Sequence, residues 1–151
     1  MILRWKLRSG VKQNRLYPTT FSIPSEDERT AVQPGDVVKL MFEQSDGWGE
    51  RMWVRVEKAG RHRMVGRLEN LPLGFPRLDI GSKIRFRREH IVDIHDDPAP
   101  PPCPDCVYEA RERQLETLRS GRRPAASADG GAGDIGMRFV HGECGGTASV
   151  D

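Results

Sequence analysis

Apolar and polar residues alternate in five short stretches between residues 36 and 94, with the period of a β-strand that has one buried face. In the clearest stretch, Met52, Val54 and Val56 share one side of the chain. The predicted strands cover residues 36–43, 51–57, 64–69, 83–87 and 91–94, and Gly, Pro, Asp and Ser residues separate them. This mainly β pattern predicts a small five-stranded antiparallel barrel, SH3-like or half-open, because closure removes exposed sheet edges.

Two local signals refine this prediction. Gly66 interrupts the third stretch and indicates a bulge or a barrel corner. Ser25 and Glu28 have the spacing of a capping box, which predicts a short helix that ends at Pro34-Gly35. We expect Phe21 and Ile23, just before that helix, to pack as an arm on the barrel.

Changes in composition divide the chain into four parts. They are an N-terminal arm with the short helix (residues 1–34), the β-barrel (35–95), a Pro-rich linker (96–102) and a Cys- and His-containing tail (103–151). A weak apolar stripe predicts one helix at about residues 107–120. The rest of the tail is partly disordered in this prediction.

A longer set of short motifs occurs in order along residues 17–95. The motifs are Thr20-Phe21, Ile23-Pro24-Ser25, Pro34-Gly35-Asp36, Val38-Lys39-Leu40, Phe42-Glu43, Gly49-Glu50-Arg51-Met52-Trp53-Val54, Gly66, Leu68-Glu69-Asn70, Gly81 and His90-Ile91-Val92-Asp93. Together they resemble the bacterial family named domain of unknown function 2314 (DUF2314). The family usually reads Leu-Asp-Asn-Glu/Asp-Pro where this chain has Leu71 before Pro72, so one acidic residue is missing here. The resemblance implies a shared fold and carries no established activity.

Composition excludes several classes of protein. No apolar run approaches the roughly 18 residues that a membrane span needs, and residues 1–5 do not begin a secretory signal, so we expect a soluble protein without a membrane partner. The three cysteines all follow residue 100, which is a poor disulfide framework and favours the cytoplasm. Formal charge is +3 over residues 1–34, +3 over 35–95 and −4 over 96–151.

The outward positions of the predicted strands form a candidate binding surface. It consists of Arg51, Trp53, Arg55, Arg67, Lys83, Arg85 and Arg87. One interpretation exposes Trp53 among these cations as a recognition platform. The alternative is that the N-terminal arm covers Trp53 with Tyr17 or Phe21.

No nucleophile, base and orienting acid stand in a recognisable pattern, so we expect a non-catalytic binding module. The first hypothesis is a protein or peptide partner, as for an accessory or immunity-type factor. The alternative is single-stranded nucleic acid, although Glu57, Glu69 and Glu89 also allow ordinary cross-strand ion pairs with these cations.

The tail contains a Cys-x-x-Cys pair and a His-x-x-Cys pair. Their residues, Cys103, Cys106, His141 and Cys144, match the soft ligands of a tetrahedral structural Zn²⁺ site. The alternatives are free thiols in a disordered tail, or a redox pair formed by Cys103 and Cys106, whose Cys-Pro-x-Cys turn resembles that of glutaredoxin-like proteins.

Overall fold

The computed structural model describes residues 4–98, 100–101, 104–120, 137–140 and 147–150. The strands are β1 (Trp5–Arg8), β2 (Val37–Gln44), β3 (Gly49–Ala59), β4 (Met64–Leu68), β5 (Asn70–Leu71), β6 (Lys83–Phe86), β7 (Ile91–Ile94), β8 (Met137–Val140) and β9 (Thr147–Val150). The helices are α1 (Gly10–Leu16), α2 (Glu26–Thr30), the 3₁₀ turn η1 (Arg88–His90) and α3 (Pro104–Arg119).

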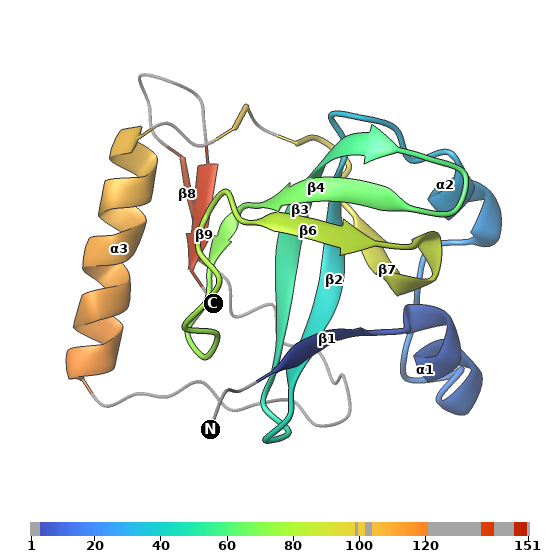
Figure 1. The fold of residues 1–151 in the computed structure, drawn as a ribbon, viewed down its shortest axis with the longest axis horizontal. Coiled ribbons are helices and arrows are strands. Elements are labelled where there is room, and N and C mark those ends of the chain that lie inside the picture. The colour runs from blue at the N-terminus through green and yellow to red at the C-terminus, as the bar shows by residue number, and fades with distance from the viewer. Residues whose placement is uncertain (1–3, 99, 102–103, 121–136, 141–146, 151) are drawn as a thin grey trace.

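The five predicted strands, joined by β1, form a six-stranded antiparallel sheet that builds the half-open barrel that the alternating pattern predicts (Figure 1). Strands β2, β3, β4 and β6 pair in chain order, and after the η1 turn the chain returns as β7 to pair with the first half of β2. Strand β1 pairs with the second half of β2, so β1 and β7 share one edge of the sheet and β6 forms the other. The predicted fold class is confirmed, and each of the five predicted strands is present.

The inner face of this sheet holds the main hydrophobic core. Met52, Val54 and Val56 lie inside it, as the alternation predicts, with exposed fractions of 2% or less. Phe75, from the loop between β5 and β6, packs edge-on against Phe42 and closes one end of the core. Burying these side chains contributes about 2 kcal/mol each to stability.

Gly66 marks a close approach between β3 and β4, as the sequence indicates. A Cβ atom there would lie 2.5 Å from the Arg55 carbonyl oxygen and from Val54 Cγ1. The bulge itself is in the facing strand, where the register shifts between Val56 and Lys58. Glycine lets the two strands pair closely at this corner.

The N-terminal part contains both predicted and unpredicted elements. Ser25 and Glu28 form the capping box at the start of α2, with both reciprocal bonds present. Phe21 and Ile23 pack on Met41 and Val92 of the sheet, which confirms the arm. Strand β1 and helix α1 precede this arm and were not predicted from the sequence.

On the other side of the barrel, α3 lies beside a second, three-stranded sheet in the order β5-β9-β8 (Figure 1). The helix begins three residues before the predicted start. It is tied to the loop between β5 and β6, where Arg111 contacts Asp79 at 2.6 Å and the Gln114 amide donates to the Pro72 carbonyl.

Candidate functional site

Trp53 is buried, with 7% of its surface exposed, so the interpretation of this residue as an exposed recognition platform is wrong. Its side chain points away from the inner core, as the alternation predicts, but this part of the outer face is covered. The Lys39 ammonium lies 4.6 Å from the ring centroid, and the His95 ring packs edge-on at 5.3 Å.

The N-terminal arm packs on neighbouring residues of the outer face. Phe21 stacks under the Arg51 guanidinium at 5.3 Å and packs with Met41, while Tyr17 remains 50% exposed. Lys39 of β2 and His95 after β7 therefore contribute cover over Trp53. The long Lys39 stem and the imidazole both offer apolar surface to the indole ring.

The predicted cations further along the sheet come together on the outer face of β3, β4 and β6. Cross-strand register places Arg55 opposite Arg67, and Arg67 opposite Lys83. In the next row, Lys58 lies opposite Val65, and Val65 opposite Arg85. Five of the six positions in these two rows are cationic. We call these five residues, Arg55, Lys58, Arg67, Lys83 and Arg85, the cationic face.

The bulge in β3 adds Lys58 to this face. Regular pairing after Val56 would set Lys58 opposite Met64, on the inner side of the sheet. The extra residue instead sets it opposite Val65, where it is exposed. Lys58 was not predicted as part of the binding surface, because the predicted strand ends at residue 57 and the sequence pattern assigns Lys58 to the start of the following turn.

Like charges directly opposite one another destabilise a sheet by tenths of a kcal/mol per pair. Two carboxylates partly offset this repulsion. The buried Glu69 pairs with Arg55, and Glu57 pairs with Arg67 at 2.8 Å in an exposed bridge. Among the described residues, no ion pair or hydrogen bond engages the Lys58, Lys83 or Arg85 side chains. The face therefore keeps a cationic excess toward solvent.

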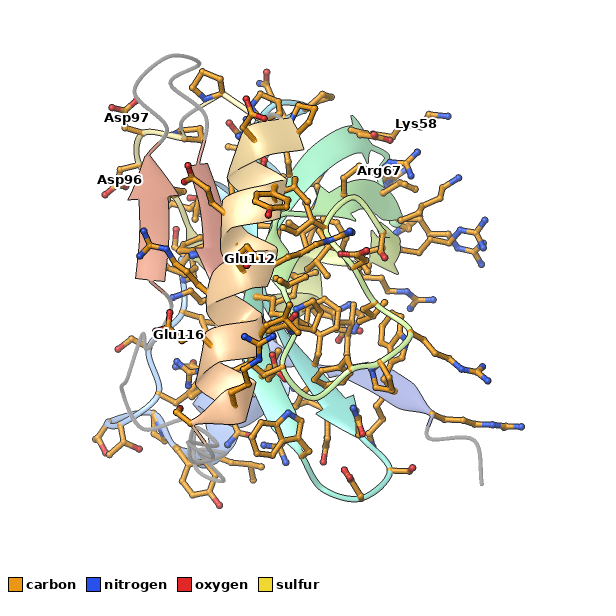
Figure 2. The ribbon with its side chains drawn as sticks, turned by 90° about the vertical axis from the view of Figure 1, so that its left-hand side faces the viewer. Lys58, Arg67, Asp96, Asp97, Glu112 and Glu116 are labelled. Atoms are coloured by element: carbon orange, nitrogen blue, oxygen red, sulfur yellow. The ribbon has the colours of Figure 1, made fainter. Side chains whose placement is uncertain are left out.

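Further exposed cations flank the face. Arg61 and Arg63 lie in the turn between β3 and β4, and Arg87 follows β6. Figure 2 shows Lys58 and Arg67 at one edge of the molecule, apart from the carboxylates that line α3. The predicted Arg51 lies elsewhere, stacked on Phe21. Arg88, next to Arg87, also points away from the face and donates to the carbonyls of Arg29, Val32 and Gly60.

The buried carboxylate of Glu50 could suggest catalysis, but its hydrogen bonds hold a loop in place. Glu50 is 8% exposed and accepts hydrogen bonds from Trp48 Nε1 at 2.8 Å, from the Leu73 amide at 3.2 Å and from the Gly74 amide at 2.5 Å. These bonds hold the loop between β5 and β6 against the barrel. The contacts of Glu50 therefore indicate a structural role.

The zinc and redox hypotheses depend on four residues of the tail, most of which lie outside the ranges that the structure describes. Cys103, His141 and Cys144 lie outside the described residues, and of Cys106 only the backbone, within α3, is described. Across the described ranges, no group of three or more His, Cys, Asp or Glu residues could hold a metal ion. Zinc binding and thiol chemistry therefore stay predictions.

Comparison with known proteins adds no relative: no family model, no curated protein and no solved structure matches this chain. The resemblance to DUF2314 rests on the sequence motifs alone. None of the helices in the described part of the chain combines the length and the apolar character that crossing a bilayer requires.

Proposed function

We propose that this protein binds nucleic acid through the cationic face, by contacts to backbone phosphates. The observation that carries the proposal is the pair of cross-strand rows in which Arg55, Arg67 and Lys83 stand abreast with Lys58 and Arg85 beside them. Phosphate contacts need closely spaced Lys and Arg side chains and no apolar pocket.

The alternative of a protein partner on the same face has less support. Stable protein interfaces centre on buried aromatic or aliphatic anchors. The exposed large apolar residues of the described chain are Leu16, Tyr17, Tyr108 and Leu115, and all lie on α1, just after it, or on α3. With Trp53 buried, the cationic face also lacks an aromatic platform for base stacking. Recognition through phosphates alone implies weak dependence on base sequence.

The test is salt-dependent binding of a labelled 20-nucleotide oligonucleotide, as single strand and as duplex, measured by fluorescence anisotropy. Neutralising four or five phosphates gives a slope of log K against log salt of about −3 to −4.5. The face variant, Arg67→Gln/Lys83→Gln/Arg85→Gln, should weaken binding at low salt by about tenfold or more and reduce the slope by about 2.

A matched control removes the same charge elsewhere. Lys6, Lys12 and Arg15 are exposed residues of β1 and α1, so their triple Gln variant should bind nearly as wild type. Equal losses in the two variants would show that net charge alone attracts the oligonucleotide and would overturn the proposal. Equally tight binding of poly-glutamate would also overturn it, because the face would then accept any polyanion.

A further inference from the structure

Helix α3 presents two chemically distinct faces. Ala110 is fully buried, and Val107 and Gln114 are half-buried, so these residues form the side that docks on the rest of the protein. At 100° per residue they cluster within one third of the helix circumference. The opposite side is exposed along its full length.

The exposed side carries an acidic stripe. It consists of Asp105, Glu109, Glu112 and Glu116, all exposed and spaced by four, three and four residues. This spacing places them on one line along the helix, about 16 Å long, directly opposite the docking side. In Figure 2, Glu112 and Glu116 lie on the visible side of α3.

Two apolar side chains run beside the stripe. Tyr108 and Leu115 are 65% and 45% exposed and are separated by seven residues, so they lie on one line next to the carboxylates. They are two of the four large apolar residues that the described chain leaves exposed. Carboxylates with neighbouring apolar residues at this spacing are typical of a helix that docks on a partner surface.

The cationic face matches this helix surface in size and in chemistry. Three neighbouring strands span about 10 Å, close to the diameter of a helix with its side chains. Together with the flanking Arg87, the basic surface extends about 13 Å along the chain from Lys83, close to the length of the stripe. Val65, half-buried at the centre of its row, offers an apolar contact for Tyr108 or Leu115.

We infer that α3 of one molecule docks on the cationic face of a second copy, with the acidic stripe over the two basic rows. The inference rests on the proposed function, because it gives the same face a competing ligand. Within one molecule α3 is held elsewhere, by the Arg111–Asp79 pair and by the bond from Gln114 to Pro72. Its stripe therefore reaches only the face of another copy.

This contact has two consequences. Because the two surfaces differ, the association is head-to-tail and extends beyond a dimer unless the rotation closes a ring. Because its apolar part is small, the contact is weak, and screening by salt dissolves it. Nucleic acid, with a higher charge density, displaces α3 from the face, so self-association and nucleic-acid binding exclude each other.

Sedimentation equilibrium tests the inference. At about 50 mM salt the average mass should rise with concentration above the monomer mass of 17.0 kDa, and at about 500 mM it should return to that value. Two variants should each remain monomeric at low salt: the face variant defined above, and the helix variant Glu109→Gln/Glu112→Gln/Glu116→Gln. Gln preserves helix propensity, so the helical signal of the variant in circular dichroism should equal that of the wild type.

Mixing the two variants gives the sharpest result. The face variant retains the acidic stripe and the helix variant retains the cationic face, so together they form one contact and a 1:1 complex that cannot grow. A control with the same loss of charge, Glu26→Gln/Asp96→Asn/Asp97→Asn, should self-associate as wild type does.

A monomeric wild type at low salt would overturn the inference and leave the oligonucleotide test of the proposed function unaffected. A mixture that stays monomeric would also overturn it, because the two retained surfaces would then not bind each other. Conversely, a 1:1 complex in a protein that binds no oligonucleotide would support the contact and remove only the proposed function.

Discussion

The outer side of the barrel sheet differs between its two halves. Over β2 and the first part of β3 it is buried under Lys39, His95 and the N-terminal arm, whereas over β4 and β6 it is open to solvent and cationic. Both halves have the same alternating sequence pattern. The difference teaches that alternation identifies the side chains that face inward, while distant segments decide whether the outward side chains reach water.

The burial patterns of β2 and β6 show this contrast. All residues of β2 from Val37 to Phe42 are buried, because its outer side chains pack under the arm and against Trp53. In β6, Ile84 and Phe86 are buried while Lys83 and Arg85 are exposed. A binding surface that relies on outward residues therefore requires the open half, and the cationic face lies there.

The largest effect should come from Trp53→Ala, which removes the ring that the covered half encloses. Truncating a buried tryptophan costs about 3–5 kcal/mol, and urea unfolding should show this loss as a lower midpoint. Oligonucleotide affinity of the remaining folded protein should not change, because the cationic face lies in the other half. Wild-type stability together with lost binding would instead mean that Trp53 is an exposed contact residue.

A pair of lysine substitutions compares the two halves directly. Lys39→Ala removes a cation that is 7% exposed and lies over the Trp53 ring, and should cost about 1–2 kcal/mol through lost packing and cation–π attraction. Lys83→Ala, on an exposed strand position, should change the free energy of unfolding by less than about 0.5 kcal/mol. Equal costs for both lysines would contradict the distinction between a covered and an open half.

The smallest effect concerns His90, in the η1 turn between the open strand β6 and the covered strand β7. Burial lowers the pKa of His90 below its usual 6.5, Glu89 opposes this shift and Arg87 adds to it. Because the folded state disfavours protonation, the neutral imidazole contributes stability above pH 6.5 that is lost as the pH falls below that value. His90→Gln should therefore flatten the dependence of urea stability on pH between about 7 and 5. If the dependence of urea stability on pH stayed the same in this variant, groups other than His90 would cause the acid sensitivity.

Much of the fold could be predicted from local sequence. The strands follow from side-chain alternation, and the capping box fixes the start of α2, because both signals act within a few residues. Strand β1 was not predicted, although Trp5 and Leu7 alternate with Lys6 and Arg8 as regularly as the residues of β6 do. Four residues outside the run of turn-separated strands do not by themselves reveal the pairing with β2. Helix α1 shares this limitation, although Ser9 accepts a hydrogen bond from the Lys12 amide as its N-cap.

The candidate site could be predicted less completely. The alternation located Arg67, Lys83 and Arg85 on the outer side, and the structure brings them together. It could not show that Trp53 is covered, because Lys39 and His95 lie far from it in sequence. It also could not locate Lys58, whose orientation depends on the pairing shift opposite Gly66.

Because of the bulge at Glu57, the charge on the surface depends on the strand register as well as on the composition. One unpaired residue reverses the orientation of the following positions, so Lys58 points to solvent and Ala59, opposite Met64, takes the place in the interior. Inserting or deleting a single residue in this strand would thus redistribute charge between the interior and the surface without exchanging any side chain.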